Sequence, residues 1–293
     1  MAIEELRPTG ADAGPAWLVG QRVSVVIPAL NEAENLPHVL PRIPPWVHEV
    51  VLVDGRSTDD TIAVARQLWP NVHIVSEERR RRVAPPGAVP LERRGAGITL
   101  RLVSQAGRGK GDALRCGFAA ATGEIIVMLD ADGSTDPAEI PAFVGALLAG
   151  ADFAKGSRFL QGGGTADMPR YRRWGNGAFV RLVRLLFGGK YSDLCYGYNA
   201  FWARVVPRLA LDGDGFEIET MMNVRALQAQ LKVVEVPSFE AKRVYGEGRL
   251  RTIPDGWRVL RTIWRERAAP RVARAPAGTA AEQRGGIDIR VSR

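Results

Sequence analysis

Short apolar runs alternate with helix-forming segments along the first half of this chain, and that alternation restricts the possible folds more than any other feature. Residues 23–27 form a β-branched run that ends at Pro28, and residues 49–53 form a second apolar run. Further strands are predicted at residues 72–75, 98–103, 124–129 and 152–156. Strands that alternate with helices pair mostly in parallel. We therefore predict an α/β fold with a mostly parallel central sheet and helices on both faces.

Helix signals fill the connections and dominate the second half of the chain. Asn31, followed by acids, is typical of a helix start, and residues 57–60 cap a helix that runs to Trp69. The other predicted elements are helices at residues 109–122, 137–149, 170–187, 216–228 and 254–267, and a strand at 233–239.

Composition separates one large domain from basic appendages. Residues 21–267 are predicted to form the domain, residues 1–20 a flexible leader, and residues 268–293 a disordered basic tail. Residues 77–97 are rich in Arg, Pro and Gly and interrupt the strand–helix pattern. We interpret them as an inserted basic loop.

Positive charge lies mainly in these appendages. The chain has a net charge of +8, to which residues 77–94 (six Arg, three Glu) contribute +3 and residues 265–293 (seven Arg, three acids) contribute +4. The rest of the chain is close to neutral, which argues against a nucleic-acid partner. An anionic surface such as a membrane is a fitting partner for the appendages, and plain solubility is the alternative explanation.

Signals of cellular location are few. Cys116 and Cys195 form no CxxC pair, which favours a reducing cytoplasm over a disulfide framework or a zinc site. Residues 1–20 carry three acids and no apolar core, so no secretory signal is expected there. No window reaches the roughly 18 apolar residues of a membrane span. We expect a cytoplasmic protein that is soluble or peripheral at the inner face of the cell membrane.

Polar side chains follow the ends of the predicted strands. Asp130 and Asp132 come directly after the run at 124–129, where two like charges are costly unless a cation compensates them. Mg²⁺ is such a cation, because it binds carboxylates together with substrate phosphates. The alternative interpretation of these two aspartates is a solvated turn after the strand. The carboxyl ends of parallel strands share one edge of the sheet. We therefore expect a nucleotide-shaped site built from residues 28–32, 54–57, 108–110 and 130–132.

Five short motifs occur in order along these segments. They are Val-Val-Ile-Pro-Ala-Leu-Asn-Glu at 25–32, Val-Asp-Gly-Arg-Ser-Thr-Asp at 53–59, Gly-Lys-Gly at 109–111, Leu-Asp-Ala-Asp at 129–132 and Gly-Ser-Arg at 156–158. Over roughly residues 22–250 the chain resembles the family 2 inverting glycosyltransferases of GT-A fold. Within that family it is most similar to the polyprenyl-phosphate sugar synthases of the dolichol-phosphate mannose synthase type. The resemblance implies a GT-A fold with an acceptor half at roughly residues 156–267.

The resemblance also implies a donor site. Lys110 matches a position near the base or the diphosphate of the donor. Asp130 and Asp132 match the DxD motif, which holds Mg²⁺ or Mn²⁺ against the diphosphate, with Asp132 in direct contact with the metal. Gly55 and Ser134 depart from the family, which often has a second Asp and, in the lipid-phosphate synthases, a Gln at those positions. The positions that match the base and ribose pocket are Pro28, Ala29, Asn31, Glu32 and Asp54.

On the acceptor side, Arg158 and Arg173 match arginines that grip the acceptor phosphate in lipid-linked members. A phosphate monoester is already anionic near neutral pH, so it needs positioning more than it needs a base. A hydroxyl acceptor would instead require a general base. Glu219 is at the matching position for that base, and we expect Glu217 to be a solvated surface residue.

Three further segments leave alternatives open. Arg243 and Arg249 match a loop that grips the donor diphosphate, or they are simply solvated. Tyr196 and Tyr198 either form a platform for the sugar or pack in the core. Residues 170–187 predict a basic amphipathic helix that carries Trp174 on its apolar stripe. Such a helix lies in a membrane interface or packs on its own domain.

The expected function is metal-dependent, inverting transfer of a sugar from a nucleotide sugar of the GDP-mannose or UDP-glucose type to a polyprenyl phosphate. Asp132, Arg158 and Glu219 are the expected catalytic residues. One alternative is a soluble or small-molecule hydroxyl acceptor with Glu219 as base. A sugar nucleotidyltransferase is less favoured because residues 28–31 replace its glycine-rich loop, and a non-catalytic basic binding module is the last alternative.

Overall fold

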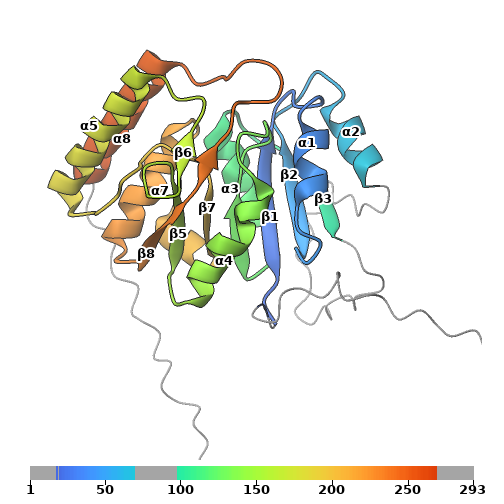
Figure 1. The fold of residues 1–293 in the computed structure, drawn as a ribbon, viewed down its shortest axis with the longest axis horizontal. Coiled ribbons are helices and arrows are strands. Elements are labelled where there is room, and N and C mark those ends of the chain that lie inside the picture. The colour runs from blue at the N-terminus through green and yellow to red at the C-terminus, as the bar shows by residue number, and fades with distance from the viewer. Residues whose placement is uncertain (1–17, 19, 70–97, 269–293) are drawn as a thin grey trace, which may run out of the picture.

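A computed structural model describes residues 18, 20–69 and 98–268 of the chain (Figure 1). Within that part, seven strands form one sheet in the order β3-β2-β1-β4-β7-β5-β8. The strands are β1 (Val23–Ala29), β2 (Glu49–Asp54), β3 (Thr99–Ser104), β4 (Ile125–Met128), β5 (Phe153–Ser157), β7 (Asn199–Trp202) and β8 (Val233–Pro237). Among these strands only β7 is antiparallel to its neighbours, β4 and β5. The prediction of a mostly parallel sheet is confirmed.

Helices cover both faces of the sheet because alternate residues of each strand point to opposite sides. Val25 and Ile27 of β1 pack in one apolar cluster with α1, α2 and α4, whereas Val26 packs on the other face with α3 and α7. The helices are α1 (Leu36–Val39), α2 (Thr61–Leu68), α3 (Lys110–Ala120), α4 (Ile140–Leu148), α5 (Arg170–Phe187), α6 (Val206–Leu209), α7 (Glu217–Gln228) and α8 (Thr252–Ala268).

A pair of helices, α5 and α8, forms one end of the molecule (Figure 1). They join α7 in a third apolar cluster that includes Val180, Val183, Val259 and Ile263. The Arg172 guanidinium of α5 donates to the Thr252 hydroxyl at 3.1 Å, which ties the starts of the two helices together. A small parallel pair of strands, β6 (Gly164–Thr165) and β9 (Phe239–Glu240), lies beside the main sheet.

Two sequence predictions are corrected at this level. Asn31 does not start a helix: its backbone is left-handed (φ 52°), and its side-chain oxygen accepts from the Thr58 amide at 2.8 Å. Helix α1 is only Leu36–Val39. Strand β7 was not predicted, because its four residues carry too short a pattern and owe their conformation to pairing with β4 and β5.

Several predictions fall outside the described residues, wholly or nearly so. They concern the leader at 1–20, the strand at 72–75, the loop at 77–97 and the tail at 268–293, and they stay predictions, as do the domain limits. Among the described residues, no helix has both the length and the apolar character that crossing a membrane requires.

Candidate active site

A cavity of about 720 Å³ lies at the carboxyl ends of β1 to β4. The strand ends carry the polar groups as expected, because parallel strands deliver their last residues to one edge. The predicted site residues that line this cavity are Pro28, Ala29, Glu32, Lys110, Asp130, Asp132, Arg158, Glu219, Arg243 and Arg249.

Three predicted site residues are absent from the cavity lining. Asn31 and Asp54 organise the neighbouring turn, where the Asp54 carboxylate accepts from the Ser57 amide at 3.1 Å. Arg173 is exposed on α5, with its guanidinium carbon 5.6 Å from the centre of the Phe159 ring. Their proposed contacts with substrate therefore stay predictions.

Lys110 joins two carboxylates at the floor of the cavity. Its Nζ lies 2.6 Å from Asp130 Oδ1 and 2.7 Å from Glu219 Oε1. Burial disfavours the ammonium charge, but the two carboxylates outweigh it and raise the pKa of Lys110. A Cβ on Gly197 would stand 2.8 Å from Glu219 Oε1 and 2.9 Å from Lys110 Nζ. Glycine at this position is what lets the three charged groups meet.

The two aspartates of the DxD segment differ in their surroundings. Burial raises the pKa of Asp130 to about 6, and the nearby Asp132 and Glu219 carboxylates act in the same direction against Lys110. Asp132 Oδ1 accepts from the Ser134 amide at 3.0 Å and from the Ser134 hydroxyl at 2.6 Å. Its other oxygen lies 3.3 Å from Arg243 Nη1. Both carboxylates thus face cations across the cavity.

This donor set fits a divalent ion that is shared with a substrate. Among the described residues no cluster of three or more His, Cys, Asp or Glu side chains could hold a metal by itself. Asp130 and Asp132 both line the cavity and supply oxygen ligands only. Mg²⁺ typically binds one or two carboxylates and completes its shell with water and substrate phosphates. Ser134 supports Asp132 by hydrogen bonding, which is a role for the position where the family often has Gln.

The segment after β9 crosses the donor end of the cavity. The Arg243 guanidinium lies 2.5 Å from Glu32 Oε2 while it also contacts Asp132, so it bridges the ends of β1 and β4. The Tyr245 amide donates to Asn35 Oδ1 at 2.8 Å, and Arg249 donates to the Leu30 carbonyl at 2.8 Å. The segment is therefore held by polar contacts with the strand ends and with the DxD segment.

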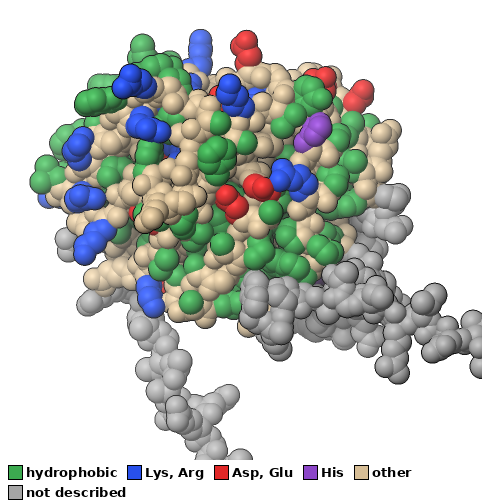
Figure 2. All heavy atoms as spheres, in the orientation of Figure 1, with side chains coloured by type: hydrophobic (Ala, Val, Ile, Leu, Met, Phe, Trp, Pro, Cys, Tyr) green, Lys and Arg blue, Asp and Glu red, His purple; other side chains and the backbone are tan. Residues whose placement is uncertain are grey.

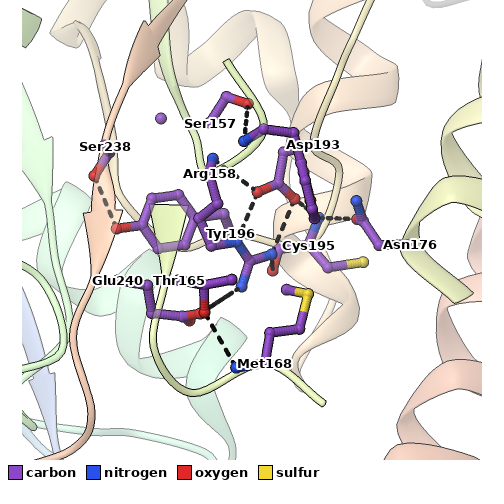
Figure 3. Close-up of polar contacts among 12 residues, drawn as sticks. Ser157, Arg158, Thr165, Met168, Asn176, Asp193, Cys195, Tyr196, Ser238 and Glu240 are labelled. Carbon is purple, nitrogen blue, oxygen red and sulfur yellow. Dashed lines mark hydrogen bonds and ion pairs between the residues drawn. The ribbon is translucent and has the colours of Figure 1, made fainter. Parts of the chain in front are cut away.

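Arg158 lines the cavity and lies among Asp193, Tyr196 and Glu240 (Figure 3). Its Nε and Nη2 donate to the Asp193 carboxylate at 2.7 and 2.9 Å, and its Nη1 donates to both oxygens of Glu240 at 3.0 and 3.1 Å. Nη2 also donates to the Cys195 carbonyl, and the guanidinium stacks on Tyr196 at 4.7 Å. Within the described residues, each Arg158 nitrogen therefore has a protein acceptor.

The two carboxylate partners of Arg158 differ in accessibility. The Asp193 side chain is fully buried, whereas the Glu240 side chain is 20% exposed and lines the cavity. Burial opposes ionisation of Asp193, but Arg158 and Lys155 outweigh it and lower its pKa. The Arg158–Asp193 pair is thus a permanent part of the fold, and the Glu240 contact is the more accessible one.

Of the remaining residues considered for the acceptor side, one lines the cavity and two do not. The Tyr196 ring lines the cavity, whereas Tyr198 is buried against Phe143 with ring centres 4.3 Å apart. Glu217 is only partly exposed, and its Oε1 accepts from the Gly215 amide at 3.0 Å. The expectation that Glu217 is a solvated surface residue is therefore wrong, and it does not line the cavity.

Sequence reasoning missed Gln105. This residue follows β3 and lines the cavity, so the strand-end rule used for the other strands identifies it as well. Arg56 and Arg108, which fall in the predicted ranges 54–57 and 108–110, line the cavity too, and neither forms an ion pair with a described residue. Guanidinium groups without an acidic partner favour an anionic ligand in this cavity.

The other end of the cavity is richer in apolar side chains. It lies between α5 and α8, and its lining there includes Met168, Tyr171, Phe179, Leu250 and Val259. Polar side chains also occur at this end: Asp167, Arg172, Asn176, Thr252 and Asp255. One continuous cavity therefore joins a charged donor end to this more apolar end.

Comparison with known proteins gives the family. The model of glycosyl transferase family 2 matches residues 24–85 and 96–208. The polyprenol monophosphomannose synthase of Mycolicibacterium smegmatis is 32% identical over 257 residues, which cover 85% of this chain and 89% of that protein. The undecaprenyl-phosphate mannosyltransferase of Micrococcus luteus is 28% identical, with 78% and 87% covered.

Solved structures share the fold. Glucosyl-3-phosphoglycerate synthase from Mycobacterium tuberculosis, in complex with Mn²⁺, UDP and glucosyl-3-phosphoglycerate, superposes with a TM-score of 0.62 at 22% identity. The match covers 87% of this chain and 83% of that one. The predicted α/β GT-A fold is confirmed.

Proposed function

This chain belongs to glycosyl transferase family 2, and from that premise we propose that it transfers a sugar from a nucleotide sugar to a polyprenyl phosphate, with inversion and with the help of Mg²⁺ or Mn²⁺. One observation carries the proposal: a single cavity runs from the carboxylate pair Asp130 and Asp132 to an apolar end between α5 and α8. A nucleoside diphosphate suits the first end, and an isoprenoid chain suits the second.

The donor would lie over the ends of β1 to β4. Pro28, Ala29 and Glu32 line the cavity there and would contact its base and ribose. When bound, a divalent ion would sit on Asp130 and Asp132 and neutralise charge on the departing diphosphate. Arg56 and Arg108 have no acidic partner within the described residues, and Arg249 has none either. They would therefore bind phosphate oxygens without first breaking an ion pair.

The acceptor phosphate would lie near Arg158. Glu240 is the more accessible of the two carboxylates on Arg158, so an incoming phosphate can replace it while Asp193 keeps the guanidinium in place. The phosphate is already anionic and attacks the anomeric carbon from the side opposite the diphosphate. No proton has to be removed at that step, and the catalytic contribution of the chain is positioning. Arg173 would contact the headgroup from outside the cavity.

The relatives support a donor of the GDP-mannose type, because two of them are named as mannosyl transfer enzymes of polyprenyl or undecaprenyl phosphates. A lipid-linked acceptor would bring the enzyme to the inner face of the cell membrane as a peripheral protein. UDP-glucose remains the second donor to test, since a structural neighbour was solved with that sugar nucleotide.

A hydroxyl acceptor is the second candidate. Glu219 lines the cavity, so it is placed to remove a proton from such an acceptor. Its carboxylate, however, is engaged by Lys110 at 2.7 Å. We favour the phosphate acceptor because it needs no base.

A transfer assay separates these acceptors. Purified protein would be incubated with labelled GDP-mannose or UDP-glucose, Mg²⁺, and one of three acceptors: polyprenyl phosphate, the matching polyprenol, or 3-phosphoglycerate. We expect chloroform-extractable label with polyprenyl phosphate and background with the other two. Label on the polyprenol or on 3-phosphoglycerate, with none on the lipid phosphate, would contradict the proposed acceptor.

A further inference from the structure

We propose that the outer face of α5 and α8 docks on an anionic lipid bilayer, so that the apolar end of the cavity lies at the membrane surface. This inference uses the proposed function for one point only, namely that a lipid acceptor enters the cavity from the membrane side. The docking itself is argued from exposure and charge, and it is tested without any substrate.

Large apolar side chains are exposed on both helices. Trp174 on α5 is 77% exposed, and Ile253 and Trp257 on α8 are 84% and 68% exposed. The inner faces of the same helices already bury Val180, Val183, Val259 and Ile263. The exposed aromatic residues are therefore not needed by the core, and surfaces of this kind mark interaction sites.

The exposed residues follow helical spacing. Ile253, Trp257 and Trp264 are four and seven residues apart and lie on one stripe of α8. Trp174 and Leu185 are eleven residues apart and share a stripe of α5, opposite its buried face. Tryptophan is favoured at the membrane–water interface because its ring is apolar and its N–H needs a polar partner.

Charge on this face has one sign. Helix α5 contains five Arg and no acid, and the two acids of α8, Asp255 and Glu266, are buried. Asp255 is paired with Arg258 and Glu266 with Arg225, so neither presents negative charge to an approaching surface. Figure 2 shows Lys and Arg side chains, with apolar ones among them, gathered over the end formed by α5 and α8.

This combination favours an anionic bilayer over other occupants. Arginines attract anionic headgroups, and the apolar stripe enters the boundary between headgroups and acyl chains. A second copy of the same face would bring like charges together, which disfavours a dimer through it. Exposed isoleucine and leucine contribute nothing to binding a nucleic-acid backbone, which disfavours that occupant.

The cavity extends between the helices that carry this face. Gly175 of α5 and Gly256 of α8 both line it, together with Tyr171 and Phe179. A Cβ on Gly175 would meet no atom within 4 Å, so the space beside this residue is open. Docking would therefore place the apolar end of the cavity next to the headgroup layer, where the phosphate of an isoprenoid lipid lies.

Vesicle co-sedimentation of the full chain tests the docking. The test variant is Trp174→Ser/Ile253→Ser/Trp257→Ser, and none of these residues lines the cavity. The control is Val234→Ser/Phe239→Ser, which removes exposed apolar side chains from β8 and β9. We expect the wild type and the control to bind vesicles of phosphatidylglycerol and phosphatidylcholine, and the test variant to bind at least about tenfold more weakly.

Two further measurements sharpen the result. Binding should fall as NaCl is raised and should be weaker on pure phosphatidylcholine, because the arginines contribute through charge. All three proteins should show the same thermal stabilisation by nucleoside diphosphate with Mg²⁺, which shows that the variants fold.

Unchanged binding by the test variant, or no binding by the wild type, would overturn the docking proposal. A wild-type dimer in size-exclusion chromatography that the test variant abolishes would also overturn it, in favour of a second copy. Sugar transfer is measured separately on detergent-dispersed acceptor, so failure of one proposal leaves the other measurable.

Discussion

Glu219 has a different role for each of the two acceptor classes, so its substitution distinguishes them. For a phosphate acceptor its role is to hold Lys110, which Asp130 also holds, so Glu219→Gln should lower kcat by about tenfold. This is the lower end for a hydrogen bond to a charged group, worth about 1.5–3 kcal/mol, because the substituted amide oxygen still accepts from Lys110. A general base contributes about 10²–10⁴ to the rate. The measurement is kcat at saturating acceptor, with Glu217→Gln as the control from the same helix.

A loss beyond a hundredfold in Glu219→Gln alone, with loss of the acidic limb of the pH–rate profile, would contradict the phosphate acceptor. Glu217 lies outside the cavity, so its variant should match the wild type in either case.

Asp193 links a buried charge pair to stability. Its pKa is lowered in the folded protein, so the stability it contributes is present above its unfolded pKa of about 3.9 and is lost as the pH falls through the lower folded value. Asp193→Asn leaves Arg158 without its buried partner and should cost about 3–5 kcal/mol of unfolding free energy at pH 7.

Urea denaturation of the wild type and Asp193→Asn at several pH values tests this. The difference in unfolding free energy should be largest near neutral pH and should shrink below about pH 4. A difference that is small at pH 7, or that grows in acid, would contradict the assignment.

Single residues were predictable from the sequence where a strand end placed them. Asp130, Asp132 and Lys110 follow strand or loop signals, and the structure brings them to one cavity. The partners of Arg158 were not predictable, because Asp193 and Glu240 are 35 and 82 residues away and meet it only through the fold. For the same reason, the sequence did not show that the Arg158 guanidinium is already paired with two carboxylates.

At the scale of elements, the segment after β9 contacts residues at the donor end of the cavity. Arg243 contacts Glu32 and Asp132, where a diphosphate with its metal would lie. Arg243→Gln should weaken binding of nucleoside diphosphate in Mg²⁺ at least about tenfold, since a hydrogen bond to a charged group is worth about 1.5–3 kcal/mol. Titration calorimetry measures the affinity.

Lys242→Gln is the matched control, because it removes a neighbouring exposed cation that does not line the cavity. Equal affinities for the two variants would show that this segment acts through general charge and not through a contact made by Arg243.

Long elements with a regular hydrophobic pattern were predicted well, and short elements were not. Helix α5 was predicted at residues 170–187 and is found there, because an 18-residue amphipathic pattern outweighs local ambiguity. The expected stripe placed Trp174 with the apolar residues, yet that side chain faces solvent while Val180 and Val183 are buried. The residue spacing showed an apolar stripe on this helix. It did not show which residues of the helix the neighbouring helices would cover.

At the scale of the whole molecule, the proposed function requires the site to bind metal and nucleotide together. The described residues contain no cluster of three or more His, Cys, Asp or Glu side chains that could hold an ion, so diphosphate should complete its coordination. We expect Mn²⁺ alone to shift the melting temperature little and the nucleoside diphosphate alone modestly. Both together should raise it by about 5–10 °C at a hundredfold excess over Kd.

A thermal-shift panel of GDP and UDP, each with and without Mn²⁺, measures this and identifies the preferred base. Additive shifts from metal and nucleotide, with no gain from the combination, would contradict a shared site.

The fold of the described residues was predictable from the strand–helix alternation and the five ordered motifs, and the comparisons confirm the GT-A fold and the family. The apolar end of the cavity did not follow, because it is assembled from α5, α8 and the segment before α8, which pack together only in three dimensions. The acceptor is accordingly the part of the function that needs the structure most.

In the proposed reaction, Asp130 and Asp132 hold a divalent ion against a departing nucleoside diphosphate. The direct measurement is release of that diphosphate with transfer of labelled sugar to polyprenyl phosphate, in Mg²⁺ and in chelator. It compares the wild type, Asp130→Asn/Asp132→Asn, and the exposed control Asp60→Asn. We predict that chelator or the double substitution lowers transfer at least about a hundredfold, whereas Asp60→Asn is unaffected. Full transfer by the double variant in chelator would contradict the account.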